Sequence, residues 1–308
     1  MRKINSISTF RLKPVPPFRL DLTAWALRRR PDNIVDRWDD KTYRRVLVLN
    51  EPVEVAVTQE GAFDEPTLFI SVTGASIGQD KEPKVSAVLN WLLGSGIDLS
   101  GFYSFAARDS RLGALAQRFR GLKPPRFPTI FEAVVNGIAC QQLTLTVGIR
   151  LLNKLAQTYG AAINGAHAFP RPADLAGVKP EALRKLGFSR QKSMAIIELS
   201  ASIAGGNLDP EDLPDLSDEE ALSRLLELRG VGRWTAEYVL MRGAGRLYVF
   251  PGDDVGARNN LQRWLGIGEK LDYEGVKKAL ESWKPYGGII YFHLLLDRLV
   301  EAGYFPEQ

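Results

Sequence analysis

The first third of the chain alternates apolar and polar residues with the period of β-strands. Three short runs rich in β-branched residues, at 43–49, 53–57 and 67–72, are separated by turn-forming residues at 50–52 and at Gly61. Short turns between consecutive strands favour antiparallel pairing. The pattern therefore predicts an antiparallel, β-rich N-terminal domain.

From residue 84 onward, apolar positions recur instead every three to four residues. Val85, Val88, Leu89 and Leu92 fall on one helical face. The segment 121–126, Gly-Leu-Lys-Pro-Pro-Arg, contains two consecutive prolines, which can extend neither a helix nor a central strand. Helical spacing without strands follows this segment, with helices predicted at 131–139, 146–159, 179–186, 190–204, 218–228, 232–242, 255–265, 273–283 and 288–302.

These patterns predict an α+β protein with a domain boundary near residue 122. Residues 1–121 would form the β-rich domain with flanking helices, and residues 122–308 an all-helical region. At roughly 100 to 200 residues per domain, a chain of 308 residues is long enough for both.

The composition excludes several chemistries. The chain has one cysteine and two histidines, whereas a disulfide needs two thiols and structural zinc or an iron–sulfur cluster needs about four soft ligands. Forty basic and 36 acidic residues give a net charge of +4. Because this excess is small, a nucleic-acid partner would have to bind a local basic face of the protein. No run of about 18 apolar residues and no secretory signal is present, and we expect a cytoplasmic protein without membrane contact.

The stretch 228–236, Leu-Arg-Gly-Val-Gly-Arg-Trp-Thr-Ala, places two glycines around one small apolar residue between two predicted helices. Glycine permits positive φ, so the pattern suits a tight turn whose backbone N–H groups face outward. Amides at a helix start match phosphate oxygens, which makes Gly230, Val231, Gly232 and Arg233 candidates for contacts with a DNA backbone. A plain turn between packed helices is the alternative for an isolated Gly-Val-Gly.

Two carboxylates follow this turn. Asp253 and Asp254 come after Phe-Pro-Gly at 250–252 and before the helix predicted at 255–265. The helix dipole favours an ionised carboxylate there, and such a group stabilises the positive charge that develops on a sugar when an N-glycosidic bond breaks. An ordinary N-cap is the alternative for a single Asp before a helix.

Together, L-R-G-V-G-R-W-T-A and V-F-P-G-D-D-V resemble the helix-hairpin-helix and the Gly/Pro-rich loop with Asp of the HhH-GPD DNA glycosylases. Within this superfamily the chain most resembles the bacterial 3-methyladenine DNA glycosylase II (AlkA) branch. The resemblance covers most of the chain and implies two helical subdomains with the active-site cleft between them. Asp254 lies 20 positions after Trp234, as in the AlkA pattern, which implies that Asp254 is the catalytic carboxylate and Asp253 a cap or supporting group.

Trp234 occupies the position after Gly-Val-Gly-x, where bifunctional members of the superfamily carry a lysine that forms a Schiff base with the sugar. Indole cannot form an imine, so the resemblance implies a monofunctional enzyme that uses water and leaves an abasic site. Trp234, Tyr238 and Met241 share one helical face, and an aromatic wall suits a flipped, positively charged base such as 3-methyladenine. A stripe buried in the core is the alternative.

The sequence departs from the family pattern near the C-terminus. Trp-Lys-Pro-Tyr-Gly-Gly at 283–288 resembles the segment W-x-P-aromatic-R-S, but Gly287 and Gly288 replace the Arg-Ser pair. Leu295 aligns with an aromatic lid residue of AlkA and is assigned to the base pocket. These differences predict a pocket that is more open on this side. His293 is expected to be a packed or capping residue.

The segment 127–144 is similar to the family segment whose turn faces DNA. A base leaves the stack only if a side chain fills the gap, and register with relatives implies Gln142 in this role, with Leu143 as the second choice. Gln141 and Gln142 could instead cap helix ends or pack between helices.

Further polar contacts are implied near the hairpin. Leu-Gly-Phe-Ser-Arg-Gln-Lys at 186–192 resembles the family turn L-G-x-S-x-x-K, with Ser189 as an N-cap and an exposed basic face. Arg233 and Arg258 flank the hairpin and the Asp loop and are better phosphate candidates. In relatives, hairpin carbonyls hold a monovalent cation. The resemblance therefore allows a structural Na⁺ or K⁺ at the carbonyls of Leu228 and Gly230, and implies no other cofactor.

The resemblance thus implies a monomeric, monofunctional DNA glycosylase that excises alkylated bases, such as 3-methyladenine and 7-methylguanine, from double-stranded DNA in base excision repair. Two alternatives stay open. A bifunctional glycosylase for oxidised bases would need a lysine where Trp234 stands, and a noncatalytic helix-hairpin-helix DNA-structure binder would not need Asp254.

Overall fold

Five antiparallel strands form the N-terminal sheet. The computed structural model describes residues 6–39, 41–75 and 81–304. In spatial order the strands are β1 (Ser6–Leu12), β5 (Thr67–Gly74), β4 (Pro52–Glu60), β3 (Thr42–Val48) and β2 (Arg37–Asp39). Every neighbouring pair is antiparallel, so the predicted pairing is confirmed.

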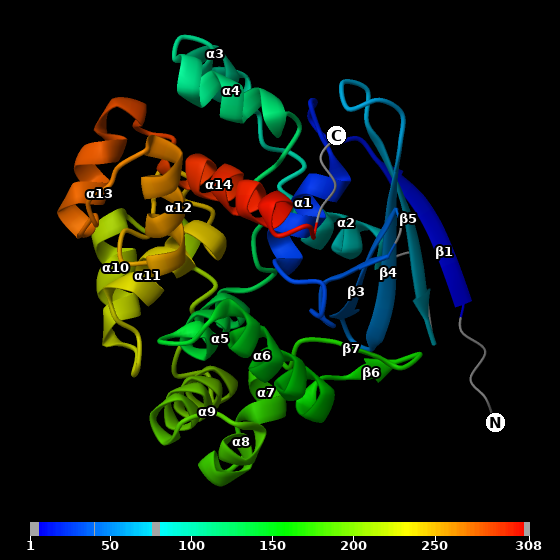
Figure 1. Ribbon diagram of the computed structural model, residues 1–308. Helices are drawn as coiled ribbons and strands as arrows, with labels where there is room; N and C mark the ends of the chain where they lie inside the picture. The colour runs from blue at the N-terminus through cyan, green and yellow to red at the C-terminus, as the bar shows by residue number, and fades with distance from the viewer. Residues whose placement is uncertain (1–5, 40, 76–80, 305–308) are drawn as a thin grey trace.

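One face of this sheet packs against two helices. Val53, Val55 and Val57 of β4 are fully buried at alternate positions, because successive strand residues point to opposite faces. Their apolar cluster includes side chains of α1 (Leu20–Arg28) and α2 (Lys81–Leu93), which Figure 1 shows beside the sheet. The sheet and these helices form the first core of the protein.

The remaining chain is mainly helical. The longer helices are α3 (Ser100–Ala106), α4 (Ser110–Arg118), α5 (Ile130–Cys140), α6 (Leu145–Tyr159), α8 (Pro180–Leu186), α9 (Arg190–Ala204), α10 (Asp218–Glu227), α11 (Arg233–Arg242), α12 (Val255–Leu265), α13 (Tyr273–Leu280) and α14 (Gly287–Glu301). Short helical turns lie at α7 (Pro172–Leu175), Leu213–Asp215 and Glu281–Trp283. The helices predicted after residue 122 are all confirmed, with ends that differ by a residue or a short turn.

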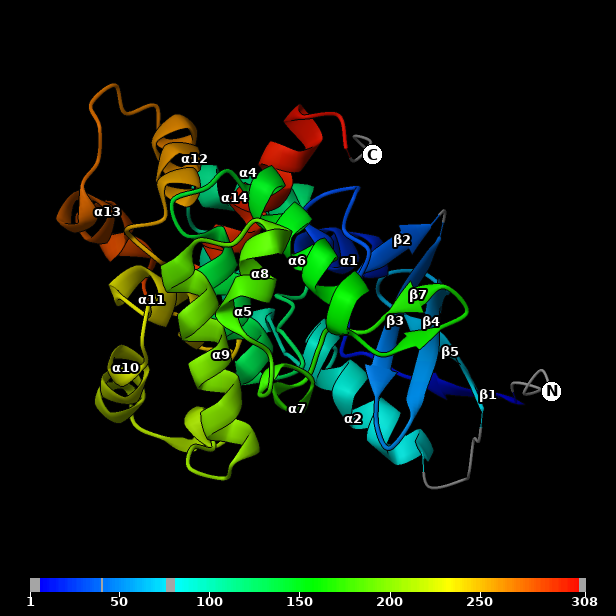
Figure 2. The same cartoon turned by 90° about the horizontal axis from the view of Figure 1, so that it is seen from below.

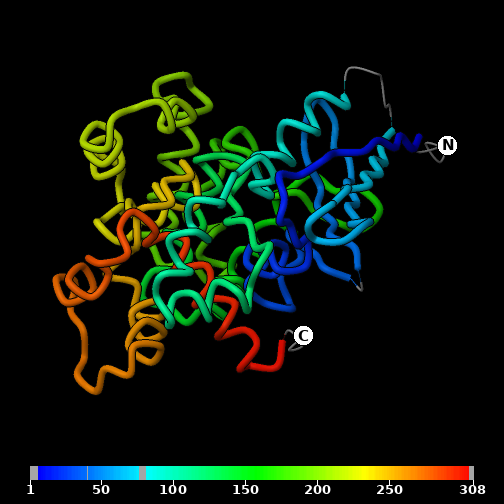
Figure 3. The backbone as a smooth tube through the Cα atoms, turned by 90° about the horizontal axis from the view of Figure 1, so that it is seen from above, coloured from blue at the N-terminus to red at the C-terminus, as the bar shows by residue number. Residues whose placement is uncertain are grey.

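The helices divide between two apolar cores. One contains residues of α5 to α11, and the other combines α12, α13 and α14 with α1, α3 and α4 from the first third of the chain. Figure 3 shows the blue segment that contains α1 beside the red C-terminal segment. Packing thus crosses residue 122. The division into 1–121 and 122–308 stays a prediction.

Several elements escaped the sequence patterns. β1, β2, α1 and the short α7 were not predicted, and β6 (Ala162–Ile163) with β7 (Ala166–His167) forms a hairpin in the region expected to be only helical. Ala166 and Ala168 pack against Val46 of β3. Figure 2 shows β7 beside β3 of the sheet. Two-residue strands carry too few positions to show a period of two.

The proline-rich boundary segment is irregular, as predicted, but it is buried. Residues 121–125 are all buried, and the Lys123 ammonium donates a hydrogen bond of 2.6 Å to the Ile97 carbonyl. Among the described residues, no helix combines the length and apolarity needed to span a membrane.

Candidate active site

A cleft of about 1180 Å³ lies where segments distant in sequence converge. Its walls come from the C-terminal end of α1, the α5–α6 loop, the starts of α11 and α12, and one face of α14. Of the residues predicted for the site, the cleft brings together Gln142, Leu143, Gly232, Arg233, Trp234, Tyr238, Asp253, Asp254 and Leu295. Gly230, Val231 and Arg258 do not line it.

The hairpin is the turn between α10 and α11. Gly230 has φ of +76°, and a Cβ there would lie 3.1 Å from the Ala195 methyl group, so glycine suits both the backbone and the packing. The Val231 amide donates to the Leu228 carbonyl at 3.1 Å, and the Val231 side chain is buried. Gly232 is exposed at the start of α11. The backbone N–H groups available to an outside partner are therefore those from Gly232 onward, at the start of α11, and not that of Val231.

Asp254 has one oxygen committed to structure and one directed to the cleft wall. Its Oδ1 accepts the Ala257 amide at 2.9 Å and caps α12, as the N-cap alternative proposed. Its Oδ2 accepts the Trp234 indole N–H at 3.2 Å. Among the described cleft residues the only carboxylates are Asp253 and Asp254, and Asp254 has no ion pair to a basic side chain.

The aromatic wall consists of Trp234 and Tyr238. Their rings stack with centroids 5.7 Å apart, and both line the cleft. Met241, predicted on the same face, is instead fully buried in the core that contains α14. Two of the three residues thus line the cleft, and the third serves packing.

Asp253 and Arg233 form an ion pair beside the hairpin. Arg233 Nε donates to Asp253 Oδ2 at 2.7 Å, and its guanidinium lies 3.7 Å from the centroid of the Tyr273 ring. Asp253 is therefore the partner of Arg233 rather than a helix cap. Arg258 lies on α12, and its Nε is buried without a hydrogen-bond partner among the described residues.

The α5–α6 loop presents the exposed residues Gln142, Leu143 and Thr144 to the cleft. Gln141 is held to the hairpin, because its side-chain amide donates to the Gly230 carbonyl at 2.6 Å and to Thr235 Oγ1 at 2.8 Å. Gln142 has φ of +54°, a strained backbone region for a residue other than glycine, and Leu143 is 42% exposed. The packing alternative thus describes Gln141, and Gln142 and Leu143 stay free to reach a partner.

Lys192 supports this loop from α9. Its ammonium donates to the carbonyls of Ala139 at 3.0 Å and Gln141 at 2.7 Å, at the C-terminal end of α5. Ser189 caps α9 by accepting the Lys192 amide, as predicted. Lys192 is therefore committed to the loop rather than to an exposed basic face.

The two glycines that replace the family's Arg-Ser pair at the start of α14 have a packing explanation. A Cβ at Gly288 would lie 2.7 Å from the Leu247 carbonyl oxygen, and one at Gly287 would lie 2.9 Å from that of Tyr248. The glycines let the chain leading to the Asp loop lie against the start of α14, outside the cleft. Leu295 lines the cleft as predicted.

Two groups on α14 and α5 that could do chemistry, His293 and Cys140, have shifted pKa values. His293 is fully buried with Nδ1 2.8 Å from the Ile289 carbonyl, and burial lowers its pKa to about 4, so it is neutral. Burial also raises the pKa of the Cys140 thiol, which disfavours the nucleophilic thiolate. His293 is a packed residue, as predicted.

Sequence patterns missed several cleft residues. Arg29 comes from the N-terminal third and carries no local motif, and Tyr291 lies in the apolar run of α14. The sequence pattern also gives no sign of four polar cleft residues, which have the spacing of ordinary exposed helix positions: Asn259, Asn260, Arg263 and Arg298. The α14 residues could have been found from their spacing, because Tyr291, Leu295 and Arg298 recur at i, i+4 and i+7.

No cluster of three or more His, Cys, Asp or Glu that could hold a metal ion occurs in the part of the chain that the structure describes. The predicted monovalent cation would depend on backbone carbonyls. The Leu228 carbonyl accepts the Val231 amide, and the Gly230 carbonyl accepts Gln141. The cation stays a prediction.

Comparison with known proteins supports the family resemblance of the hairpin and the aspartate loop. Residues 135–285 match the family described as HhH-GPD superfamily base excision DNA repair protein. The chain contains an HhH-GPD domain over these residues. The matched region contains the α5–α6 loop, the hairpin and Asp254.

The similarity extends beyond the matched region. YfjP of Bacillus subtilis, provisionally named a DNA-3-methyladenine glycosylase, is 27% identical over 93% of this chain and 97% of its own length. The structure of a 3-methyladenine DNA glycosylase from Archaeoglobus fulgidus has a TM-score of 0.82 at 27% identity and covers 94% of this chain and 99% of its own.

An 8-oxoguanine glycosylase/lyase of Clostridium acetobutylicum, solved with double-stranded DNA, shares the fold of this chain. Its TM-score is 0.74 at 15% identity, over 97% of this chain and 98% of its own. Lyases and the A. fulgidus enzyme thus have the same architecture, including the β-rich domain. The cleft residues, rather than the fold, must decide the chemistry.

Proposed function

We propose that the protein is a monofunctional DNA glycosylase that excises alkylated bases, of the 3-methyladenine and 7-methylguanine type, from double-stranded DNA in base excision repair. The observation that carries this proposal is the Asp254 carboxylate, held in the cleft by the α12 amide and the Trp234 indole. The fold and the named relatives support the same reading.

In this proposal a nucleotide leaves the DNA stack and its base enters the cleft. The base lies against Trp234 and Tyr238, and the sugar lies beside Asp254. As the N-glycosidic bond breaks, its electron pair goes to the base and positive charge grows on the sugar. A fixed carboxylate stabilises that charge more in the transition state than in the ground state, and water then attacks the sugar.

The cleft offers no amine for lyase chemistry. No lysine occurs among the described residues that line it, and the residue after the hairpin is Trp234. Lys192, which supports the α5–α6 loop, is bound to two carbonyls. A Schiff base with the sugar therefore has no donor, and hydrolysis is the reaction that remains.

Incubation with a methylated DNA duplex tests the proposal against both alternatives. We expect release of free 3-methyladenine or 7-methylguanine, measured by chromatography, with an intact abasic strand on a denaturing gel. Borohydride should trap no protein–DNA adduct, because no lysine occurs among the described residues that line the cleft. Strand cleavage with a trapped adduct would instead identify a bifunctional enzyme, and binding without base release a noncatalytic binder.

We also propose that the hairpin and the α5–α6 loop hold the DNA. The amides that start α11, with Gly230, Gly232 and Arg233 nearby, would contact phosphates, and Arg258 is kept as an electrostatic candidate. Gln142 or Leu143 would fill the gap left by the flipped nucleotide. We further propose that the protein acts on DNA as a monomer in the cytoplasm, and at the nucleoid if the cell is bacterial.

Alanine substitutions distinguish the two candidates for the gap. Leu143 is apolar and 42% exposed, so Leu143→Ala removes contact with stacked bases, whereas Gln142→Ala removes a polar side chain on a strained backbone. We expect the variant of the filling residue to lose about 10-fold or more in base release, because unstacking costs a few kcal/mol per step. Fluorescence of 2-aminopurine beside the lesion should fall with it, while binding to undamaged DNA is kept. Unchanged rates in both variants would remove the loop from this role.

A further inference from the structure

A half-buried carboxylate close to the cleft has no part in the chemistry proposed above. Glu237 lies on α11, four residues after Arg233, and does not line the cleft. Its Oε1 accepts the Tyr273 hydroxyl at 2.5 Å, and its Oε2 is buried without a hydrogen-bond partner among the described residues. Burying a carboxylate oxygen without a partner costs free energy, and the hydrogen bond from Tyr273 offsets part of that cost.

The pKa shifts of this pair agree with a hydroxyl donor and a carboxylate acceptor. Burial raises the pKa of the Tyr273 hydroxyl and Glu237 raises it further, so Tyr273 keeps its proton at neutral pH. Burial also raises the pKa of Glu237, and three groups lower it: the Tyr273 hydroxyl, Arg233 and the Gly252 amide. The groups that stabilise the Glu237 charge thus come from α13, from the hairpin end of α11 and from the loop before Asp254.

The Tyr273 ring supports the loop at 250–253. A Cβ at Gly252 would lie 2.7 Å from Cδ2 of this ring, so the buried glycine backbone lies closer to the ring than any other residue could. The Arg233 guanidinium is 3.7 Å from the centroid of the same ring. Figures 1 and 2 both show α13, which begins at Tyr273, beside α11. One side chain therefore joins α11 to the loop.

The loop in turn sets the start of α12. The Asp254 amide donates to the Pro251 carbonyl at 2.9 Å, which closes a turn directly before the helix. Asp254 Oδ1 caps α12, and its Oδ2 accepts the Trp234 indole N–H. A shift of the loop away from Tyr273 would therefore move this carboxylate relative to Trp234 and to the cleft.

We propose that Tyr273 and Glu237 are positioning residues, whose hydrogen bond keeps the loop at 250–253 in place and thereby holds the Asp254 carboxylate where the sugar binds. This inference rests on the proposed glycosylase function and adds two residues outside the cleft to it. Their role is geometric, because neither side chain touches the substrate and no proton passes between them. The exposed ion pair of Asp253 with Arg233 is a weaker connection of the same loop.

Tyr273→Phe tests the hydrogen bond while keeping the ring that supports Gly252. Both Glu237 oxygens would then lack a side-chain partner among the described residues, and water drawn to them would loosen the contact between α13 and α11. Because small displacements of a reacting group are costly, single-turnover release of 7-methylguanine should fall about 10- to 100-fold. The affinity for an undamaged duplex should stay unchanged, since the ring beside Arg233 remains.

Two substitutions of Glu237 distinguish its geometry from its charge. Glu237→Ala removes the acceptor and should slow release as far as Tyr273→Phe does. Glu237→Gln keeps an acceptor oxygen in the same place, so its rate should stay within about 5-fold of the wild type, the difference between a charged and a neutral acceptor. A Glu237→Gln variant as slow as Glu237→Ala would overturn the positioning role.

A double-mutant cycle measures whether the pair acts through Asp254. Adding Tyr273→Phe to Asp254→Asn should cause no further loss of rate, because the remaining activity no longer depends on where a carboxylate lies. If Tyr273 acted through DNA contacts of Arg233 or through general stability, the two losses would multiply. Multiplied losses would overturn the proposal.

Tyr43→Phe is the matched control. The Tyr43 hydroxyl also donates to a carboxylate, Asp36 Oδ1 at 2.8 Å, but it lies in the first core, outside the cleft. This variant should lower the thermal unfolding midpoint and leave base release unchanged. Equal slowing by Tyr43→Phe, or a Tyr273→Phe variant as fast as the wild type, would overturn the proposal. No base release by the wild-type protein would instead refute the proposed glycosylase function itself.

Discussion

Replacing Asp254 with asparagine is expected to lower the rate of base release by about 100- to 1,000-fold, the loss typical of removing one group that stabilises developing charge. The carboxylate is the one negative group of the described cleft without a basic partner. An amide of the same shape cannot balance positive charge on the sugar. Single-turnover release of 7-methylguanine from a defined duplex measures the effect.

Asparagine is the informative replacement because Asp254 also caps α12. Its Oδ1 accepts the Ala257 amide, and asparagine caps helices about as well as aspartate. The side-chain oxygen of asparagine can serve the cap while only the charge is lost. The fold, the thermal unfolding midpoint and the affinity for DNA should therefore stay close to those of the wild-type protein.

Asp253→Asn is the matched control. Asp253 is adjacent, also lines the cleft, and pairs with Arg233 at an exposed site, where ion pairs contribute about 0 to 1 kcal/mol. Its loss should change release by less than about 10-fold. Equal losses in the two variants would assign the effect to the charge of the loop as a whole. An Asp254→Asn variant as fast as the wild type would refute the assignment.

The helical region and its motifs could be predicted because their signals are local. The hairpin glycines, the Asp254 cap and the apolar spacing of α9 and α12 each lie within one short stretch, and the structure has these helices where the pattern places them. The same holds for β3, β4 and β5, whose alternation spans several residues.

Contacts between distant segments could not be predicted. Arg29 reaches the cleft only because α1 packs with α14, and nothing in residues 20–29 indicates that packing. Gln141 and Gln142 are neighbours of the same type, yet one is held to the hairpin and the other is exposed. Only the fold decides which of two adjacent glutamines has a partner.

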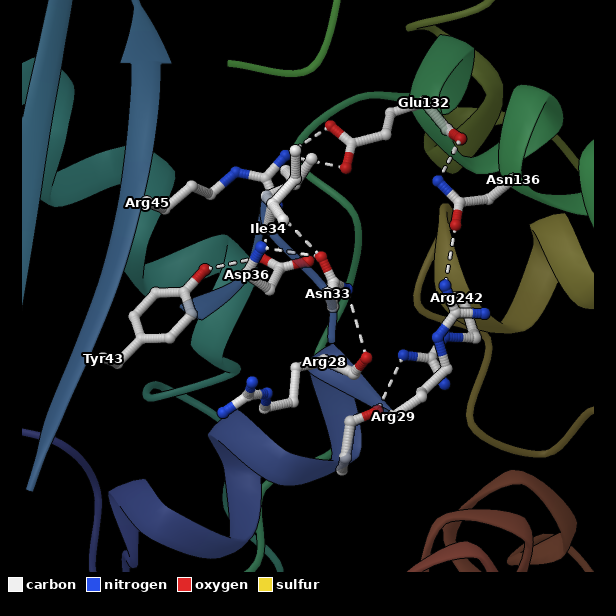
Figure 4. Close-up of polar contacts among 12 residues, drawn as sticks. Arg28, Arg29, Asn33, Ile34, Asp36, Tyr43, Arg45, Glu132, Asn136 and Arg242 are labelled. Atoms are coloured by element: carbon white, nitrogen blue, oxygen red, sulfur yellow. Dashed lines mark hydrogen bonds and ion pairs between the residues drawn. The ribbon is translucent and has the colours of Figure 1, made fainter. Parts of the chain in front are cut away.

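Arg45 is the second residue with a large expected effect, in this case on stability. It lies on β3, and Figure 4 shows it between Asp36 and Glu132. Its Nη1 is 2.6 Å from Asp36 Oδ1, and its Nη2 is 2.5 Å from Glu132 Oε2 on α5. All three side chains are at least nine-tenths buried. Burial alone would lower the pKa of Arg45, but Asp36 and Glu132 outweigh it and hold that pKa well above its ordinary value.

Arg45→Met should lower the free energy of unfolding by about 3 to 5 kcal/mol, because it leaves two carboxylates buried without a counter-charge. Urea denaturation at neutral pH measures the change. Arg44→Met is the matched control on the same strand. Arg44 pairs with Asp39 where both side chains are more than one-third exposed, so its loss should cost about 1 kcal/mol or less.

A triple variant distinguishes the lost charge from lost packing. Adding Asp36→Asn and Glu132→Gln to Arg45→Met removes the unpaired charges while keeping the shapes of both side chains, so most of the stability should return. Recovery would mean that Arg45 is required chiefly to neutralise Asp36 and Glu132 between the sheet and α5. If Arg45→Met costs no more than Arg44→Met, the buried ion pairs contribute no more than exposed ones, and β3 is held to α5 by apolar packing instead.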